Sequence, residues 1–361
     1  MSQQQRIVIV GGSAAGPKAA AKARRLDQHA QITIIQKEPD LSMASCGYPY
    51  YVGGVFDERN KLLCTPTGVV RDPTFFTNAK GISALTCKEV TAIDREAHTV
   101  TYRDVDSGDE DRMAYDKLVL ATGARPMMPP VTGLELDGIT TLQSMRDADF
   151  LRRIRDDGRT KRAVVVGGGL IGVETCEALH LAGIDITLVE MLPQVLTFLD
   201  PEMAALVENH MTAKGAHVIT ENPVSAFLGE DGRLTGVKLK NGTELDCELA
   251  VIATGVIPNT ELAALAGLDI GKRGIEVNEY MQTSDPDIYA AGDCVQVPNM
   301  ITGEPVHAPY GDLANLEARV AAQNLTTGNA VTFPGTIQTG ICKVFDYTAG
   351  TTGLSERAAA D

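Results

Sequence analysis

Apolar residues along this chain occur in short runs that lead into glycine-rich turns, and each turn is followed by a helix-forming stretch. The first example is RIVIVGGSAAGPKAAAKARRL (residues 6–26), in which an apolar run precedes two glycines and an alanine-rich stretch. A second apolar run, QITIIQKEPD (31–40), follows shortly after it. A continuous apolar run is typical of a strand in a parallel sheet, because such a strand is covered on both faces. The pattern therefore predicts a strand, a helix and a second strand over residues 6–40.

The same order of elements recurs in the middle of the chain. RAVVVGGGLIGVETCEALHLAG (162–183) repeats the strand, the glycine turn and the helix, and IDITLVE (184–190) supplies the second strand. In such a unit the glycines permit a tight turn, let the backbone approach a pyrophosphate, and let the helix pack on the strand. The helix N-terminus presents N–H groups and a partial positive charge to the phosphates. Two such units predict an α/β protein that binds two dinucleotides.

Two further apolar runs end in Ala-Thr-Gly, at YDKLVLATGARP (115–126) and LAVIATGVIPN (249–259). Each is preceded by a stretch with strand character, residues 82–106 and 232–246, which we expect to form antiparallel strands laid over the core of each unit. SDPDIYAAGDCVQ (284–296) is another strand, and it ends in glycine and an acid. Strands therefore recur through both units without a flexible linker between them.

Composition and charge narrow the class of protein. Hydrophobic residues make up 44% of the chain and charged residues 22%, as in ordinary soluble α/β proteins. No apolar run approaches the ~20 residues that span a bilayer. The polar start MSQQQ lacks the apolar core of a signal peptide, so we expect a cytoplasmic location. The net charge of −15 argues against nucleic acid or an anionic membrane as the partner.

The seven cysteines indicate a reducing compartment and packing roles for most of the thiols. Their spacing contains no CxxC pair and no pattern typical of a metal site, and their number is odd. A disulfide framework and a metal centre are therefore not expected.

Five motifs, GGSAAG, ATGARP, GGGLIGVE, ATGVIPN and AAGDC, occur in an order that resembles the flavin-dependent pyridine nucleotide–disulfide oxidoreductases. Within them, SMASCGYPYYVGG (42–54) is similar to the branch that has a single redox cysteine. That branch contains coenzyme A-disulfide reductases, CoA-dependent persulfide reductases, NADH oxidases and NADH peroxidases. The resemblance extends over residues 6–357.

The resemblance implies two Rossmann-like three-layer domains followed by the start of an α+β dimerisation domain. The FAD-binding domain would be split into residues 1–125 and 284–335, with the NAD(P)H-binding domain, residues 126–283, inserted between them. Residues 336–361 would begin the dimerisation domain, and its remainder would be absent from this chain. The complete protein would therefore form a homodimer.

The resemblance also implies which residues bind FAD. The first glycine turn would surround the pyrophosphate, the ATGARP segment would line the flavin, and Asp293 would accept hydrogen bonds from hydroxyl groups of FAD. Either Gln36 or Glu38 would hold the adenosine ribose, and the sequence leaves both open. The residues expected at FAD are Gly11, Gly12, Ser13, Gly16, Gln36, Lys37, Glu38, Ser42, Ser45, Val90, Thr122, Gly123, Arg125, Asp293 and Ala314.

The second glycine turn would bind the pyrophosphate of NAD(P)H. Glu174 matches the family position near the nicotinamide. Glu190 ends the second strand, where a carboxylate binds the ribose 2′-hydroxyl of NADH and repels the 2′-phosphate of NADPH. NADH is therefore expected, with NADPH as the alternative. The residues expected at NAD(P)H are Gly167, Gly169, Leu170, Ile171, Gly172, Glu174, Glu190 and Gly255.

Cys46 is the redox thiol that the resemblance implies. Relatives with an internal dithiol carry a second cysteine five residues further on, where this chain has Tyr51. Cys46 would therefore cycle between a thiolate and a sulfenic acid, a persulfide or a mixed disulfide with a small thiol. NADH would pass hydride to FAD, and the reduced cofactor would pass electrons to the sulfur.

The first hypothesis for the substrate is CoA disulfide or a CoA-type persulfide. Oxidase and peroxidase relatives typically carry a histidine in the first glycine turn, where this chain has Ala14. Two alternatives remain: an NADH oxidase or peroxidase that cycles Cys46 through a sulfenic acid, and an inactive flavin-binding redox sensor.

A basic helix face supports CoA as the bound thiol. Lys18, Lys22 and Arg25 share one face of the first helix by their spacing. Lysine and arginine are the usual partners of phosphate groups, so this face would bind the phosphates of CoA. The residues expected at CoA are Lys18, Lys22, Arg25, Ser42 and Ser45.

Overall fold

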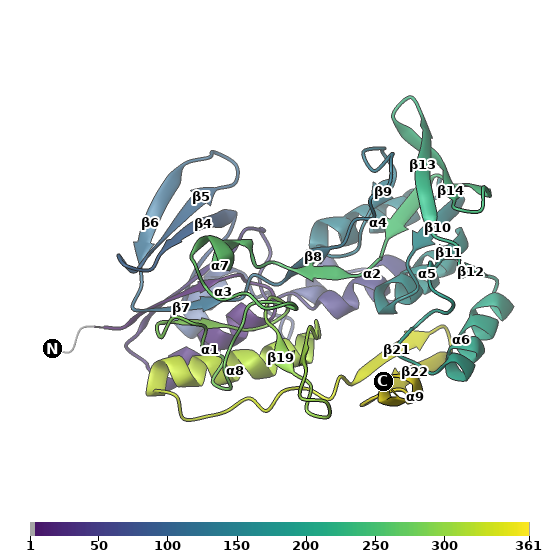
Figure 1. Cartoon of the computed structure of the whole chain (residues 1–361). Helices are drawn as coiled ribbons and strands as arrows, with labels where there is room; N and C mark the ends of the chain where they lie inside the picture. The colour runs from purple at the N-terminus through teal and green to yellow at the C-terminus, as the bar shows by residue number, and fades with distance from the viewer. Residues whose placement is uncertain (1–3, 361) are drawn as a thin grey trace. The chain divides into compact units, whose positions relative to one another are not determined.

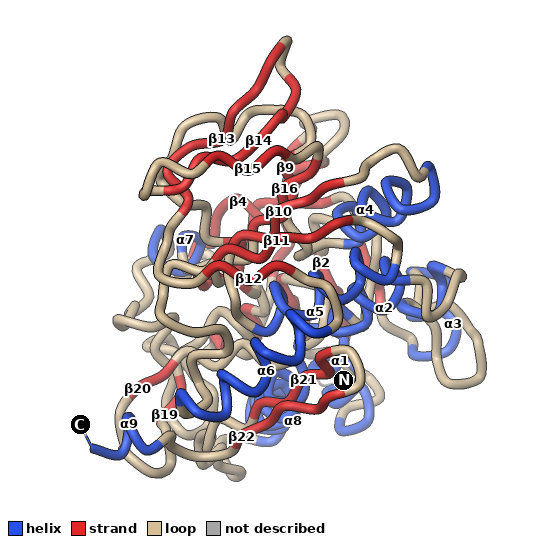
Figure 2. Tube along the Cα trace, turned by 90° about the vertical axis from the view of Figure 1, so that its right-hand side faces the viewer, coloured by secondary structure: helices blue, strands red, loops and turns tan. Residues whose placement is uncertain are grey.

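A computed structural model describes residues 4–360 and shows two compact units, each built on a five-stranded parallel sheet (Figures 1 and 2). No helix within the described residues is long and apolar enough to cross a bilayer. The first unit comprises Met1–Ala44, Asn60–Arg125 and Pro258–Ile337, and the second comprises Ser45–Arg59, Pro126–Ile257 and Gln338–Asp361.

The first unit has a parallel sheet in the order β18-β7-β1-β2-β3. Val10 is aligned with Ile35 on one side and with Leu120 on the other, so the carboxyl ends of the central strands share one edge. Helices α1 and α8 lie on one face of the sheet, and the antiparallel strands β4-β5-β6 lie on the other (Figure 1). The elements are β1 (Arg6–Val10), α1 (Ala15–Leu26), β2 (Gln31–Ile35), α3 (Pro73–Lys80), β3 (Ser83–Leu85), β4 (Lys88–Asp94), β5 (Thr99–Asp104), β6 (Glu110–Ala114), β7 (Lys117–Leu120), α7 (Glu261–Leu265), β18 (Ile288–Ala290), β19 (Val297–Pro298), β20 (Pro305–Val306) and α8 (Gly311–Thr327).

The second unit repeats this arrangement with a parallel sheet in the order β12-β11-β10-β16-β9. The antiparallel strands β13-β14-β15 lie on one side of the sheet, and α5 and α6 lie on the other (Figure 2). The hairpin β21-β22 packs against these two helices. The elements are the 3-10 turn η1 (Ser45–Gly47), α2 (Tyr48–Gly53), β9 (Ile139–Thr140), α4 (Met145–Asp157), β10 (Arg162–Val166), α5 (Leu170–Leu181), β11 (Asp185–Val189), α6 (Pro201–Ala213), β12 (His217–Ile219), β13 (Val224–Glu230), β14 (Arg233–Leu239), β15 (Glu244–Asp246), β16 (Leu249–Ile252), β21 (Gly340–Val344), β22 (Tyr347–Thr351) and α9 (Glu356–Ala360).

Three short elements complete the chain. They are the 3-10 turn η2 (Arg59–Leu62) and the strands β8 (Ala124–Pro126) and β17 (Val256–Pro258). The two strands pair with each other and follow the two Ala-Thr-Gly segments.

The predicted α/β class and both strand–helix–strand units are confirmed. One expectation was partly wrong, since residues 83–85 do not join the antiparallel layer. They form β3, which pairs in parallel with β2, because Ile82 and Ala84 are buried in the core of the first unit. The compact units also group residues differently from the predicted domains: 45–59 belong to the second unit and 258–283 to the first. The division into cofactor domains therefore stays a proposal.

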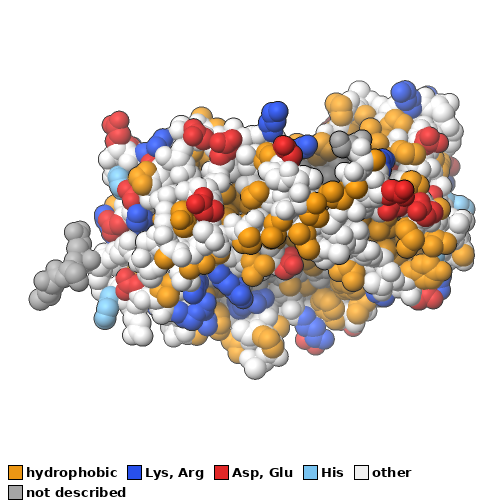
Figure 3. Space-filling view, turned by 60° about the horizontal axis from the view of Figure 1, so that its bottom comes forward, with side chains coloured by type: hydrophobic (Ala, Val, Ile, Leu, Met, Phe, Trp, Pro, Cys, Tyr) orange, Lys and Arg blue, Asp and Glu red, His pale blue; other side chains and the backbone are white. Residues whose placement is uncertain are grey.

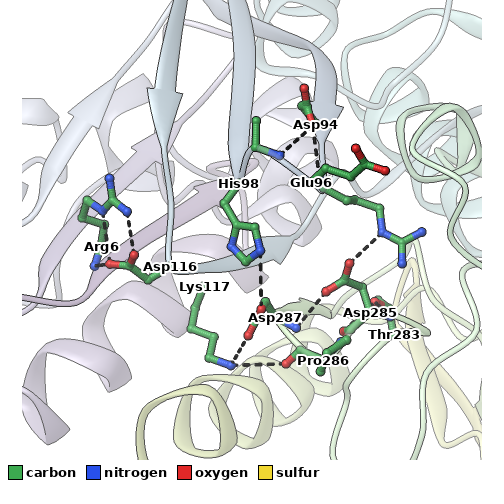
Figure 4. A network of polar contacts seen from close by, with 12 residues as sticks. Arg6, Asp94, Glu96, His98, Asp116, Lys117, Thr283, Asp285, Pro286 and Asp287 are labelled. Atoms are coloured by element: carbon green, nitrogen blue, oxygen red, sulfur yellow. Dashed lines mark hydrogen bonds and ion pairs between the residues drawn. The ribbon is translucent and has the colours of Figure 1, made fainter.

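Ion pairs join the strand ends at the amino-terminal edge of the first sheet (Figure 4). Nη2 of Arg6, at the start of β1, lies 2.6 Å from Oδ1 of Asp116, which directly precedes β7. Nζ of Lys117 lies 2.6 Å from Oδ1 of Asp287, which directly precedes β18. The glycine turn after β1 follows the carboxyl end of that strand, so these pairs lie at the opposite edge of the sheet from the turn.

The variant Asp116→Asn is expected to lower the free energy of unfolding by about 1 kcal/mol near neutral pH. The hydrogen bond from Arg6 lowers the pKa of Asp116 below its ordinary value of 3.8. The carboxylate therefore stabilises the fold above that ordinary value, and the contribution is lost as the pH falls through the lowered pKa. Urea unfolding at neutral and acidic pH measures the effect. Asp106→Asn, in an exposed turn, is the control, and a difference that does not change with pH would contradict the assignment.

Candidate active site

The first glycine turn, which links β1 to α1, forms an open cradle of backbone. Gly11 has a φ of +110°, and a Cβ there would lie 2.0 Å from the carbonyl oxygen of Ala121. A Cβ at Gly16 would lie 1.9 Å from the carbonyl oxygen of Gly11. Both positions therefore require glycine. No side chain caps the N-terminus of α1, so its N–H groups can meet a phosphate.

The second glycine turn repeats this geometry between β10 and α5. Gly167 has a φ of +111°, and a Cβ there would lie 2.3 Å from the carbonyl oxygen of Ala253. A Cβ at Gly172 would lie 1.9 Å from the carbonyl oxygen of Gly167. Gly169 precedes α5, and here too no side chain caps the helix. Two turns with the same stereochemistry fit the pyrophosphates of two dinucleotides.

The residue just after the second strand reaches back to the glycine turn in both units. In the second unit, Oε2 of Glu190 accepts a hydrogen bond from the N–H of Gly168 at 2.6 Å. In the first, Oε1 of Gln36 accepts one from the N–H of Gly12 at 2.9 Å. Gln36 is therefore the structural equivalent of Glu190, whereas Glu38 lies two residues beyond that position.

Of the other residues expected near the adenosine part of FAD, some lie at the first glycine turn and others contact different parts of the first unit. The N–H of Ser42 donates to the carbonyl oxygen of Gly12 at 2.7 Å, which fixes Ser42 at the turn. Nζ of Lys37 instead lies 2.8 Å from Oε1 of Glu89 on β4. Val90 packs against the hydrophobic core of the first unit. Only Ser42 of these three is therefore brought to the glycine turn by a hydrogen bond.

The segment after β7 is fixed by an asparagine that sequence reasoning missed. Oγ1 of Thr122 donates to the carbonyl oxygen of Asn259 at 2.7 Å, and Nδ2 of Asn259 donates to the carbonyl oxygen of Thr122 at 2.8 Å. Arg125 donates to Oδ1 of Asn259 at 3.0 Å and pairs with Glu261. Gly123 has a φ of +65° with open space beside it. In the sequence, the feature that could have drawn attention to Asn259 was the Pro-Asn pair shortly after the second Ala-Thr-Gly segment.

The turn before Asp293 packs against the N-terminal ends of α1 and α8. Gly292 has a φ of +87°, and a Cβ there would lie 3.1 Å from Cβ of Ala15 and 3.5 Å from Cβ of Ala314. The N–H of Gly292 donates to Oε2 of Glu317 at 2.7 Å. Burial raises the pKa of Glu317 to about 8 and also raises the pKa of Asp293. Sequence reasoning missed Glu317, because a glutamate in an amphipathic helix gives no sign that it is buried.

The residues of the first unit fit FAD. The first glycine turn leaves no room for a Cβ at Gly11 or Gly16, and no side chain caps the N-terminus of α1. Beside this turn, three small residues from separate segments lie close together: Ala15, Gly292 and Ala314. Ser45 is the only residue predicted at FAD that falls in the second compact unit.

Most residues predicted at NAD(P)H lie around the second glycine turn. Leu170 and Ile171 form the first turn of α5, and Glu174 follows one turn later. Gly255 has a φ of +105° and lies in the turn after β16. Ala253, in the same turn, is the residue whose carbonyl oxygen would lie 2.3 Å from a Cβ at Gly167. The second unit therefore brings these residues to the carboxyl edge of its sheet.

Cys46 lies in η1, directly before α2, and its side chain is exposed. Burial raises the pKa of the Cys176, Cys247 and Cys342 thiols to about 12, and that of Cys294 to about 11. Since the thiolate is the reactive form, these four thiols are poor nucleophiles. Exposure therefore favours Cys46 as the working thiol.

Tyr51 stands where dithiol relatives carry their second cysteine, and its ring is buried. Its hydroxyl donates to Oδ1 of Asp149 at 3.3 Å. The guanidinium of Arg152 lies 5.3 Å from the centre of the ring and donates to the carbonyl oxygen of Tyr51. Tyr51 therefore holds α2 against α4, and a structural residue replaces the second thiol.

Basic side chains gather on the face of the first unit over α1 and α8 (Figure 3). Burial lowers the pKa of Lys18, and the charges of Arg319, Arg25 and Arg71 lower it further. We call these four residues and Lys22 the basic cluster. Among the described residues, none of the five has an ion pair with a carboxylate. Arg71 and Arg319 were not found from the sequence, because they come from distant segments.

Comparison with known proteins places these features in context. The profile of the family described as pyridine nucleotide-disulphide oxidoreductase matches residues 5–310. The chain is 36% identical to an NADH oxidase of Methanocaldococcus jannaschii over 97% of this chain and 76% of that protein. It is 30% identical to a coenzyme A disulfide reductase of Staphylococcus haemolyticus over 97% of this chain and 77% of that protein. It is 33% identical to an NAD(P)H coenzyme A polysulfide/persulfide reductase of Pyrococcus horikoshii over 99% of this chain and 78% of that protein.

Solved structures give the same result. An NAD-dependent persulfide reductase from A. fulgidus superposes with a TM-score of 0.95 at 44% identity, over 99% of this chain but 65% of that one. The reduced Bacillus anthracis CoADR-RHD gives a TM-score of 0.93 at 38% identity, over 98% of this chain and 62% of that one. The predicted resemblance, the oxidoreductase class and the FAD and NAD(P)H cofactors of the family are confirmed. The chain spans about two thirds or less of these two solved proteins.

Proposed function

We propose a function from the premise that this chain belongs to the pyridine nucleotide-disulphide oxidoreductases, the family whose profile matches residues 5–310. In the proposed reaction NADH is the reductant, FAD is the bound cofactor, and Cys46 is the sulfur that meets the substrate. The substrate is CoA disulfide or a CoA-type persulfide. The names of two relatives, a CoA disulfide reductase and a CoA polysulfide/persulfide reductase, support this substrate class.

The observation that carries CoA as the substrate is the basic cluster. Its cations have no acidic partner among the described residues, although the chain as a whole carries a net charge of −15. Burial is the main reason why the pKa of Lys18 is lowered, and repulsion by the charges of Arg319, Arg25 and Arg71 lowers it further. A ligand with several phosphate groups, such as CoA, would relieve that repulsion and form charge-assisted hydrogen bonds.

The two glycine turns support the proposed cofactors. In the first unit, Gly11 and Gly16 would cradle the pyrophosphate of FAD and Gln36 would face its adenosine ribose. In the second unit, Gly167 and Gly172 would do the same for NADH. Bound FAD would supply two-electron chemistry between the nicotinamide and sulfur.

The chain connection also supports Cys46 as the acceptor. Ser42 is anchored to the first glycine turn by its hydrogen bond to Gly12. Cys46 follows Ser42 by four positions along the chain, and four extended residue steps span about 14 Å at most. This short connection supports the proposed role of Cys46.

Glu190 is proposed to select NADH over NADPH. No lysine or arginine occurs in residues 190–199 that could neutralise a 2′-phosphate. Glu190→Gln keeps an acceptor for the N–H of Gly168 and removes the charge. We expect the ratio of kcat/KM for NADH to that for NADPH to fall about tenfold or more. Glu202→Gln, at the exposed start of α6, is the control, and an unchanged ratio in the Glu190 variant would contradict the proposal.

An NADH oxidase is the second candidate, and the Methanocaldococcus jannaschii relative favours it. In that reaction Cys46 would pass through a sulfenic acid. Ala14, just before α1, supplies no acid or base for such chemistry. We therefore place this function second.

The deciding experiment follows NADH oxidation in parallel with CoA disulfide, CoA persulfide, hydrogen peroxide and oxygen. The proposal predicts fast turnover with at least one of the two CoA substrates. Fast turnover with only peroxide or oxygen would overturn it in favour of the oxidase or peroxidase.

Assembly and location belong to the same proposal. A second copy of the chain is the proposed partner, and the cytoplasm is the proposed compartment. Light scattering of the purified protein would measure the assembly, and a monomer at working concentrations would contradict the homodimer.

A further inference from the structure

Glu317 is a buried carboxyl group of the first unit that the proposed reaction does not use. It lies on α8 and is 2% exposed. Its Oε2 accepts a hydrogen bond from the N–H of Gly292 at 2.7 Å, and within residues 4–360 its carboxyl group has no other hydrogen bond. No lysine, arginine or histidine in this part of the chain forms an ion pair with it. A negative charge on Glu317 would therefore be buried without a cation to balance it.

The hydrogen bond of Glu317 holds the turn that directly precedes Asp293. Gly292 has a φ of +87°, and a Cβ there would lie 3.1 Å from Cβ of Ala15. Ala15 is the first residue of α1, and no side chain caps the N-terminus of that helix. This N-terminus follows the first glycine turn, where the pyrophosphate of FAD is proposed to bind. The turn that Glu317 holds therefore lies directly beside the proposed FAD site.

Several titratable groups lie around this turn, but none of those described is a cation paired with Glu317. Nε2 of His307 lies 2.8 Å from the carbonyl oxygen of Asp293. Burial raises the pKa of Glu317 to about 8, and the charge of Asp293 contributes. The elements packed here contribute Asp293 and Cys294 after β18, His307 after β20, Tyr310 before α8, Asp312 and Arg319 on α8, and Lys18, Lys22, Arg24 and Arg25 on α1. A buried carboxyl group in such surroundings favours its neutral form.

We propose that Glu317 keeps a proton while FAD is bound and loses it when FAD leaves at alkaline pH, so that this buried carboxyl group makes the affinity for FAD depend on pH. One proton is taken up from solvent when FAD binds and is returned when FAD leaves, and no other bond is formed or broken. The inference rests on the proposed FAD site of the first unit and is independent of the sulfur substrate.

The charge of FAD is the reason for this coupling. A pyrophosphate carries negative charge to the N-terminus of α1, beside the turn, and the bound cofactor excludes water from it. Like charge and loss of water both disfavour the ionised form of a carboxyl group. A neutral carboxyl group still has an oxygen that accepts from the N–H of Gly292. The protonated form of Glu317 therefore keeps the turn before Asp293 in place without repelling the phosphates.

The direction of the effect follows from linkage between the proton and FAD. Below the pKa of about 8, Glu317 is protonated with and without FAD, so the affinity does not change with pH. Above that value the protein without FAD loses the proton, and FAD can bind only with its return. The affinity for FAD is therefore highest at neutral pH and falls as the pH rises through about 8.

The test measures the Kd for FAD from the fluorescence of FAD that the holoenzyme releases on dilution, calibrated with free FAD at each pH. In wild type we expect the Kd to rise about tenfold between about pH 7.5 and pH 9.5. Glu317→Gln keeps an acceptor for the N–H of Gly292 but cannot ionise, so its Kd should not change with pH. Glu304→Gln alters an exposed glutamate between β19 and β20 and should behave like wild type.

A second measurement does not require a variant that folds. In holoenzyme whose glutamate carboxyl groups carry ¹³C, the infrared C=O band of a protonated glutamate should remain at about pH 9. Glu174, whose pKa burial raises to about 7, is largely ionised at that pH and does not supply the band. Absence of the band from wild-type holoenzyme would overturn the inference.

The remaining outcomes separate this inference from the proposed function. A constant Kd in wild type, or an equal rise in Glu317→Gln, would overturn the inference. His307→Asn keeps a donor for the carbonyl oxygen of Asp293 and should retain the rise; its loss would assign the titration to His307 instead. If the purified protein binds no FAD, the proposed function fails as well. If it binds FAD and turns over a CoA substrate while the Kd stays constant, only the proton on Glu317 is wrong.

Discussion

Replacement of Cys46 by serine is expected to reduce turnover of CoA disulfide or CoA persulfide by about 1000-fold or more, while FAD remains bound. Serine cannot form the mixed disulfide, and its hydroxyl is a far weaker nucleophile than a thiolate at neutral pH. Cys46 is also exposed, whereas four other thiols are buried and have raised pKa values. None of these four can replace it. Steady-state NADH oxidation with each substrate measures the loss, and the flavin absorbance of the purified protein measures cofactor content.

The control for this variant is Cys64→Ser, because Cys64 is a partly exposed thiol on the first unit. It should retain the activity of the wild type. In Cys46→Ser, rapid mixing with NADH should still bleach the flavin, since that step precedes the thiol. Unchanged substrate turnover in Cys46→Ser would contradict the proposed reaction, and a wild type that is equally inactive would favour a flavin-binding redox sensor.

Reversal of two charges in the basic cluster is expected to raise the KM for CoA disulfide by about 100-fold. Lys18→Glu combined with Arg319→Glu replaces two cations, one on α1 and one on α8, with anions. Each lost contact with a phosphate group costs on the order of 1 kcal/mol near a protein surface, and the new repulsion adds to it. The KM measured at low ionic strength should show the largest change, since salt screens exposed charges.

The substrate itself provides the sharpest control for this double variant. Pantethine contains the disulfide and the pantetheine arm of CoA disulfide but no phosphate, so its KM should change little. Lys272→Glu alters an exposed lysine outside the cluster and should leave both substrates unaffected. A parallel rise in the KM for pantethine would show that the cluster does not act through phosphate groups.

The strand–glycine–helix units could be predicted because their signals are local. The apolar run at residues 6–10, the turn at Gly11 and the alanine-rich stretch after it follow one another in sequence. The stereochemistry of such a turn depends on its own few residues and on the strand it joins. The structure accordingly contains β1, α1 and β2 where the pattern indicated them. The second unit follows the same rule.

The partners of individual side chains could not be predicted in this way. The sequence left both Gln36 and Glu38 open for the adenosine ribose, and the hydrogen bond from the N–H of Gly12 shows that Gln36 reaches the glycine turn. Arg71 and Arg319 lie far from Lys18 along the chain, so no spacing rule connects them to it. These relations depend on contacts between distant segments, which local patterns do not encode.

The sequence by itself determined the class of fold and the positions of the two glycine turns, because glycine stereochemistry and apolar periodicity are properties of short segments. The redox role of Cys46 stays a proposal that the family resemblance supports. The tertiary structure alone decided which charges are paired. Glu174 and Glu177 lie three residues apart on one helix, yet only Glu177 meets Lys343 and the backbone of Phe345. Burial and distant partners set the charge and the hydrogen bonds of a carboxyl group, and both arise only when the segments pack together.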